Sequence, residues 1–195
     1  MATRRDWLDA GLEILAADGA PAVTIERLTE RLGLSKGSFY HHFGGSGGFR
    51  TALLAHFEAR YTTRLIDAVE QEPGASPAAK LRRLLELILK DPDAANLEIA
   101  VRAWALQDDE VRAAQARVDR TRTEYLRVLC RGLAKDLDSL PADPDRLAQL
   151  LYLVLIGAEQ VLPALPSGEL RELYAMTLQL ATGESLLDGK SRGSS

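Results

Sequence analysis

Apolar residues recur at spacings of three and four along almost the whole chain, which is the period of amphipathic helices. The N-terminal part predicts four helices, and no segment alternates as a half-buried strand would. The first helix spans about residues 3–18 and stops at Gly19. Thr24, Ser35 and Ser46 are placed to cap the next three, because hydroxyl side chains accept hydrogen bonds from the free N–H groups at helix starts.

The run 71-QEPGASP-77 interrupts this pattern, since proline and glycine break helices, and it marks the best candidate boundary. About five more helices follow, separated by breaks such as 141-PADPD-145. The sequence therefore predicts an all-α protein with an N-terminal three-helix domain and a C-terminal helical bundle. We expect the first domain to span 1–46, the linking helix and bundle to span 47–187, and residues 188–195 to form a disordered tail.

Two short helices joined by 32-LGL-34 are predicted to form a helix-turn-helix, because Gly33 permits the sharp turn that this motif needs. In such a unit the second helix enters the DNA major groove. Phe39 and Phe43, one turn apart, would face inward. The residues of the second helix that would then face phosphates and bases are Lys36, Gly37, Ser38, Tyr40 and His41.

Composition restricts the surroundings of the chain. The net charge is −4, and residues 1–50 contain six Lys/Arg and six Asp/Glu, so bulk charge does not draw this protein to nucleic acid. The single cysteine, Cys130, excludes an internal disulfide and is better explained as a small core residue than as a redox sensor. Neither a signal peptide nor a membrane-length apolar run is present. We therefore expect a soluble cytoplasmic protein with no membrane partner.

Five residues fall in register with a known DNA-binding signature: Gly33, Ser35, Gly37, Tyr40 and Phe43. On these residues, the segment of about 3–57 resembles the DNA-binding domain of the TetR (tetracycline-repressor-like) regulators. The rest of the chain resembles that family only in the number and length of its helices. One departure concerns the lysine that the family usually carries at the start of the fourth helix, where this chain has Ser46.

The resemblance implies a homodimer that binds a pseudo-palindromic double-stranded DNA operator, responds to a small-molecule effector and needs no cofactor. Effector binding would tilt the fourth helix and change the separation of the two recognition helices, which must be about 34–36 Å to fit successive major grooves. Repression is the usual direction, and activation is the alternative. The implied DNA-binding residues, with the first two forming a short arm, are Arg4, Arg5, Thr24, Ser35, Lys36, Gly37, Ser38, Tyr40, His41 and Ser46.

The C-terminal helices predict a binding site for a largely apolar effector that contains an aromatic group, because such sites are mostly apolar with a few placed polar groups. Leu84 and Ile88, for example, are four residues apart and share one helix face. The alternative is that these side chains are plain core. The candidate ligand-binding residues are Leu84, Ile88, Arg102, Trp104, Gln107, Tyr125, Leu129 and Tyr152.

The segment 147-LAQLLYLVLIGAEQVL-162 is apolar on nearly every side, whereas a lone surface helix keeps a polar face. With the final helix it could form a four-helix interface with a two-fold mate. The alternative is that it is simply the central helix of the bundle. The candidate dimer residues are Leu147, Leu151, Val154, Leu155, Ala158, Leu162, Leu173, Met176 and Leu180.

Other functions find less support in the sequence. His41 and His42 diverge on a helix and lack a cysteine or carboxylate at ligand spacing, which disfavours a metal site. The loop 44-GGSGG-48 lacks the lysine of a phosphate-binding loop and is interpreted as a flexible hinge. No nucleophile–base pair indicates an enzyme. A helical interaction protein that binds DNA weakly or not at all remains the alternative, supported by Ser46 and the neutral charge of residues 1–50.

Overall fold

The computed structural model describes residues 3–91, 94–137, 142–161 and 165–183, and all regular structure in these ranges is helical. The N-terminal elements are α1 (Arg4–Asp18), η1 (Ala20–Ala22), α2 (Ile25–Leu32), α3 (Lys36–Phe43), α4 (Ser46–Glu58), η2 (Ala59–Thr63) and α5 (Arg64–Glu70). They are followed by α6 (Pro77–Ile88), α7 (Ala94–Ala105), α8 (Asp109–Asp136), α9 (Pro144–Gln160) and α10 (Ser167–Thr182). The predicted all-α class is confirmed, whereas the predicted disordered tail lies outside the described residues. Within those ranges, none of the helices combines the length and apolarity that a membrane crossing requires.

Residue contacts divide the chain into two compact units, each of which draws on two separate stretches of sequence. Unit 1 consists of Met1–Arg64 with Asp91–Arg120, and unit 2 consists of Leu65–Lys90 with Thr121–Ser195. The three helices α1–α3, called the head below, therefore share unit 1 with α4, α7 and the start of α8. A functional division after residue 46 stays a prediction.

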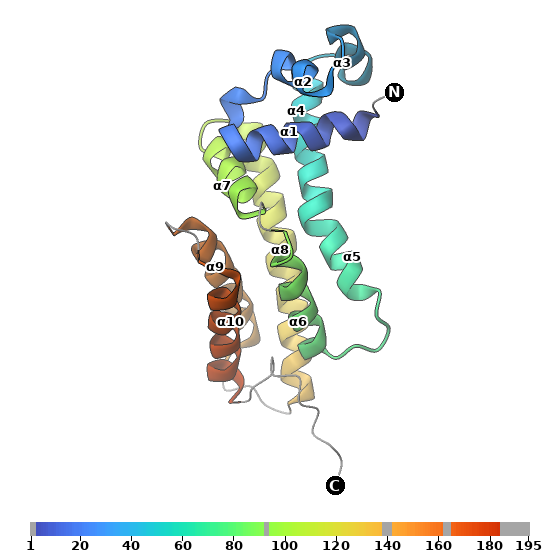
Figure 1. The fold of residues 1–195 in the computed structure, drawn as a ribbon. Helices are drawn as coiled ribbons and strands as arrows, with labels where there is room; N and C mark the ends of the chain where they lie inside the picture. The colour runs from blue at the N-terminus through green and yellow to red at the C-terminus, as the bar shows by residue number, and fades with distance from the viewer. Residues whose placement is uncertain (1–2, 92–93, 138–141, 162–164, 184–195) are drawn as a thin grey trace. The chain divides into compact units, whose positions relative to one another are not determined.

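An aromatic cluster fixes the head within unit 1. Trp7 of α1 and Phe39 of α3 are fully buried, and their ring centroids lie 5.5 Å apart in an edge-to-face arrangement. Phe39 also contacts Phe43 and, on α4, Phe49, at centroid distances of 5.2 and 5.3 Å. In the same unit α1 contacts both α4 and α7 (Figure 1). Helix α3 is thus held on α4 by buried rings.

The glycines after α3, which were predicted to form a flexible hinge, make a close corner between α3 and α4. Gly44 ends α3 in the left-handed region with φ of 70°, where glycine is favoured. Gly48, in the first turn of α4, lies so close to the end of α3 that a Cβ atom there would be 2.2 Å from the carbonyl oxygen of Phe43. The predicted cap at Ser46 is wrong, because Gly45 occupies the cap position and Ser46 is the first helical residue.

Apolar residues recur at every fourth position from Phe49 to Leu65, and this stripe predicts one continuous α-helix. The structure instead has a π-helical turn, η2, after α4. The stripe did not reveal this turn because Phe57 and Tyr61 remain in contact, with ring centroids 5.6 Å apart. Such turns often lie at functional positions. Here the turn brings the Tyr61 hydroxyl to 3.4 Å from Asp91 Oδ2, so it joins the end of α4 to the segment that leads into α7.

Unit 2 has an apolar core of its own, built from α6, the C-terminal part of α8, α9 and α10. The Tyr174 hydroxyl of α10 donates a hydrogen bond to the Leu151 carbonyl oxygen of α9 at 2.7 Å. Cys130 is fully buried in this core, and burial raises its pKa to about 12. The thiol is therefore protonated at neutral pH, as expected for a core residue rather than a reactive one.

Candidate nucleic-acid interface

Local hydrogen bonds set the start of α3. Ser35 Oγ accepts from the Ser38 N–H at 3.3 Å, and Thr24 Oγ1 accepts in the same way from the Arg27 N–H at 3.2 Å to begin α2. Gly33 ends α2 in the left-handed region, with φ of 65°, and turns the chain into α3. The N-terminal end of the second helix is the part that meets base edges in a helix-turn-helix, so these caps position it.

One side of α3 is polar and open to solvent. The exposed residues of this helix are Lys36, Gly37, Tyr40 and His41. Tyr40 has 51% of its surface exposed, while its ring edge packs on Phe39 with centroids 5.8 Å apart. Ser38 and His42 are half-buried. The structure therefore brings the predicted contact residues of α3 onto one surface above the buried rings.

The cations of the head and of the start of α4 are mostly engaged with acidic side chains. The pairs are Arg5–Asp9, Arg27–Asp18, Arg31–Glu13, Lys36–Glu26, and Arg50 with both Asp108 and Glu110. Arg4 instead lies over the Phe43 ring, 5.2 Å from its centroid. Five of the six Lys/Arg side chains of residues 1–50 are thus paired with carboxylates, and Arg4 and Arg5 belong to α1 rather than to a separate arm.

The Lys36–Glu26 pair is the one that involves α3. The hydrogen bond from Lys36 lowers the pKa of Glu26, and the same bond raises the pKa of Lys36. Both groups are therefore charged at neutral pH. The side chains remain 57% and 67% exposed, so water and salt screen their attraction and either partner can be exchanged.

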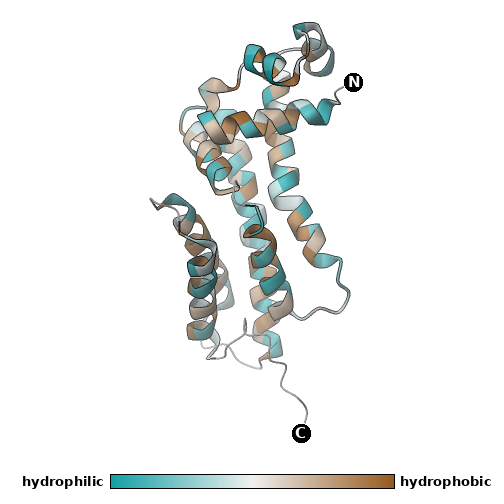
Figure 2. Ribbon diagram, viewed as in Figure 1, coloured by the Kyte–Doolittle hydropathy of each residue, from teal (hydrophilic) through white to brown (hydrophobic). Residues whose placement is uncertain are grey.

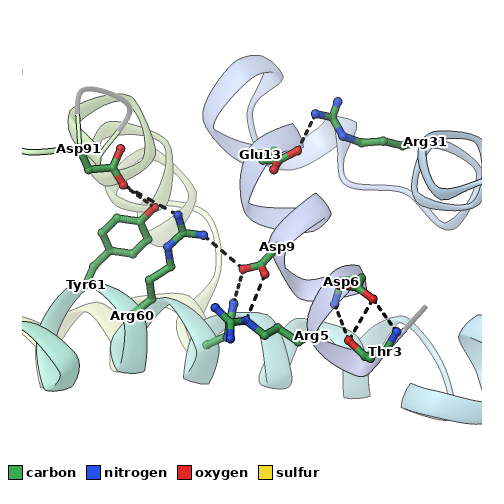
Figure 3. A network of polar contacts seen from close by, with 10 residues as sticks. Thr3, Arg5, Asp6, Asp9, Glu13, Arg31, Arg60, Tyr61 and Asp91 are labelled. Carbon is green, nitrogen blue, oxygen red and sulfur yellow. Dashed lines mark hydrogen bonds and ion pairs between the residues drawn. The ribbon is translucent and has the colours of Figure 1, made fainter. Parts of the chain in front are cut away.

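A second polar network fixes α1 on α4 and η2 (Figure 3). Asp9 accepts a hydrogen bond from Arg60 Nη1 at 3.2 Å, and its carboxylate lies 2.7 Å from His56 Nε2 and 3.4 Å from Arg5 Nε. Burial by itself would raise the pKa of Asp9, but these basic neighbours lower it. The network keeps the carboxylate ionised and holds the first helix of the head in place.

Comparison with known proteins identifies the family. Residues 8–46 match the sequence model of the family described as "Bacterial regulatory proteins, tetR family". The HTH-type transcriptional repressor Rv1474c of Mycobacterium tuberculosis is 31% identical over 182 residues, covering 78% of this chain and 91% of that protein. The chain belongs to the TetR family. Its helix-turn-helix is therefore that of a DNA-binding transcriptional regulator.

Two further comparisons show how far the similarity extends. The Transcriptional regulator AcuR of Cereibacter sphaeroides is 34% identical over 73 residues, covering 37% of this chain and 33% of that protein. The chain thus spans about a third of that relative. The crystal structure of Escherichia coli NemR in its reduced form has the same fold, with a TM-score of 0.78, 21% identity, and coverage of 94% of this chain and 100% of that one. The TetR fold therefore extends through the C-terminal helices.

The candidate ligand-binding residues are divided between the two units. Trp104 packs against the core of unit 1, and Gln107 is exposed at the end of α7. The other apolar and aromatic candidates share the apolar cluster of unit 2, and they are Leu84, Ile88, Tyr125, Leu129 and Tyr152. The Tyr125 hydroxyl donates to Glu70 Oε1 at 2.7 Å. Their contact with an effector stays a prediction.

Arg102, a predicted polar contact for the effector, already has protein partners. Its guanidinium donates to the Asp119 carboxylate at 2.8 and 3.2 Å and lies 2.8 Å from Glu98 Oε1. Glu98 is almost fully buried, and Gln115 Nε2 also donates to it at 2.9 Å. A buried carboxylate needs such partners, so in this structure Arg102 stabilises the packing of α7 on α8.

The structure differs from the predicted dimer residues on α9, because four of them face the chain's own core: Leu147, Leu151, Leu155 and Ala158. On one face α9 is thus a central helix, while the opposite face is exposed and carries large apolar side chains among polar ones. Hydrophobic residues recur along both α9 and α10 (Figure 2). The exposed large ones on these two helices and the residue after α9 are Leu150, Leu153, Val161, Met176 and Leu180. Val154 and Leu173 are half-buried, and Leu162 lies outside the described residues.

Sequence reasoning missed Glu26, Leu150 and Leu153. Glu26 and Lys36 are ten residues apart on different helices, and only the turn of the helix-turn-helix brings them together. Leu150 and Leu153 belong to a helix that is apolar on nearly every side. The spacing of its apolar residues therefore could not show which of them are exposed and which are buried. As for metals, no group of three His, Cys, Asp or Glu side chains gathers like a ligand set in the part of the chain that the structure describes.

Proposed function

We propose that this protein is a ligand-responsive TetR-family repressor. A homodimer binds a pseudo-palindromic operator through two copies of α3 and leaves it when a small, largely apolar effector binds. The observation that carries the DNA-binding part is the exposed polar face of α3 on a base of buried rings. The similarity to a protein named as a repressor supports the direction of control.

On the DNA, each part of the interface takes a role that its chemistry suits. Tyr40 and Lys36 donate hydrogen bonds to phosphates, and His41 faces base edges in the major groove. Thr24 and Ser35 offer their helix starts, whose N–H groups favour anions. These roles follow from exposed donors on or beside α3. Arg4, Arg5, Gly37, Ser38 and Ser46 complete the proposed interface.

The exposed apolar face of α9 and α10 is the proposed dimer interface. Leu153, Met176 and Leu180 each expose more than half of their surface, which favours a protein partner over water. Gly157 lies on the exposed side of α9, and a Cβ atom added there would meet nothing within 4 Å. Two α9 helices can therefore approach each other closely at this position. Four helices, two from each copy, would bury the face.

In the proposed mechanism, charged contacts in unit 1 couple α4, on which the head packs, to the corner between α7 and α8. Arg50 of α4 bonds Glu110 at 2.7 Å and Asp108 at 3.0 Å, and the Thr51 hydroxyl also donates to Glu110. Both acidic residues lie at the corner between α7 and α8. A shift of this corner must therefore move α4 or break charged contacts. The effector then selects the arrangement for which it has the higher affinity.

The first prediction concerns the interface. Tyr40→Phe should weaken binding to a duplex from the gene's own upstream region about tenfold, because a hydrogen bond to a charged phosphate is lost. Lys36→Ala should weaken it too and reduce the slope of log K against log salt by about one unit or less. Melting temperatures should hardly change, since Tyr40 and Lys36 are exposed. Fluorescence anisotropy across a salt series measures both effects.

Lys135→Ala, which removes one positive charge from the end of α8, is the control and should leave DNA affinity unchanged. Parent-like binding by both test variants would overturn the assignment of α3 as the contact helix. A parent protein that binds no duplex, even at low salt, would favour the alternative function, a helical ligand-binding or interaction protein. The engagement of the head's cations with acids is the observation that favours this alternative.

The second prediction concerns the effector. A compound at about 100 times its Kd stabilises the native state by about 2.7 kcal/mol, which raises the melting temperature of a chain of this size by roughly 5–10 °C. We expect such shifts from apolar aromatic compounds. Tyr125→Ala should abolish the shift and the release of DNA. If a compound raises the melting temperature of Tyr125→Ala as much as that of the parent, the effector site lies elsewhere.

A further inference from the structure

The recognition helix α3 has one lysine or arginine, Lys36, and its ammonium group already pairs with a carboxylate. Lys36 is the first residue of α3, and its Nζ contacts Oε1 of Glu26 in the first turn of α2. Glu26 is not needed as the helix cap, because Thr24 performs that role. The sequence separation of ten residues is closed by the sharp turn at Gly33.

The contact has the features of an exchangeable pair. Both side chains are more than half exposed, so no burial holds the ammonium and the carboxylate together. A carboxylate oxygen and a phosphate oxygen are the same kind of acceptor for an ammonium group. In a helix-turn-helix the first helix of the motif crosses the DNA backbone, so Glu26 would stand close to phosphates.

We propose that Glu26 competes with DNA phosphate for Lys36 and thereby suppresses binding to DNA of arbitrary sequence. If Lys36 leaves Glu26 for a phosphate, the carboxylate is left uncompensated beside a polyanion, and an ammonium shared between the two cannot neutralise both charges. The phosphate contribution, which is the same for every sequence, is reduced by this exchange. Base-edge contacts therefore contribute a larger share of the remaining affinity.

The inference rests on the proposed DNA-binding function, and Glu26→Gln tests it. Affinities for a short duplex of arbitrary sequence are measured by anisotropy across a salt series. The variant should bind more tightly, and its slope of log K against log salt concentration should be about one unit steeper. The ratio of its affinity to that of the parent then grows about eightfold for each tenfold fall in salt concentration. Its affinity for the upstream duplex should rise by the same factor, because the phosphate contribution is common to both duplexes.

Glu30→Gln is the matched control, because it makes the same charge change on an exposed residue one turn later in α2. It should change the slope much less, since Glu30 is not the partner of Lys36. A double-mutant cycle then isolates the mechanism. In a Lys36→Ala background, Glu26→Gln should have no more effect than Glu30→Gln. Unchanged melting temperatures show that every variant is folded.

Two results would overturn the inference alone: parent protein that binds the upstream duplex while Glu26→Gln and Glu30→Gln behave alike, or a Glu26→Gln gain that persists in full without Lys36. The second would mean that Glu26 repels DNA directly. If the parent and every variant bind no duplex at low salt, the proposed function fails and this inference fails with it.

Discussion

Replacing Gly48 by alanine is expected to destabilise unit 1 by about 3 kcal/mol or more, because the new methyl group has no space. A Cβ atom at this position would lie 2.2 Å from the Phe43 carbonyl oxygen, and neither backbone can yield without separating α3 from α4. Denaturant unfolding followed by circular dichroism measures the loss. DNA binding should fall as well, since the corner holds the recognition helix on the Phe39–Phe49 contact.

Gly47→Ala provides a matched control one residue earlier. No atom lies within 4 Å of a Cβ at Gly47, and alanine favours helix over glycine by up to about 1 kcal/mol. This variant should be as stable as the parent or slightly more so. Equal stability of the two variants would show that the corner is looser than the structure places it, and would support the interpretation of this loop as a hinge.

A charge on the exposed face of α9 is expected to abolish the proposed dimer. Leu153 is 58% exposed and Leu180 on α10 is 76% exposed, so Leu153→Glu or Leu180→Glu should leave the fold of the chain intact. Burying that carboxylate against a second copy would be costly. Light scattering should show twice the 21.3 kDa chain mass for the parent and a single chain for each variant. Operator affinity should fall about 100-fold, because the two heads are no longer linked.

Leu106→Glu is the control for this experiment. Leu106 is 79% exposed, and it lies at the end of α7 in unit 1 rather than on α9 or α10. The same substitution there should change neither the mass in solution nor operator affinity. If the parent is monomeric at micromolar concentration, or if Leu153→Glu remains a dimer, the proposed interface is wrong, and with it the basis for expecting a palindromic operator.

The local structure of the head could be predicted because its causes lie within a few residues. Thr24 and Ser35 cap their helices through hydrogen bonds to residues three positions later, and Gly33 supplies the left-handed turn between them. The helical period places Phe39 and Phe43 inward, and both are buried. Those interactions are nearly the same in any fold that contains this segment, so the sequence alone predicts them.

The roles of the C-terminal residues could not be assigned in this way. Arg102 was predicted to hold an effector, but packing of α7 on α8 places it against Glu98 and Asp119. Trp104 and Tyr125 were predicted for one site, and the structure assigns them to different units. In each case the decisive neighbours come from another helix, and their positions depend on packing that the helical period does not specify.

The sequence by itself determined that the chain is helical, where the head's helices begin and end, and which surface of α3 faces outward. Only the tertiary structure decided which side of α9 is core, because a helix that is apolar all round carries no periodic difference between Leu151 and Leu153. It also decided that Lys36 meets Glu26. Capping and helical period act within one or two turns of chain, whereas burial and ion pairing depend on residues that only the completed fold brings together.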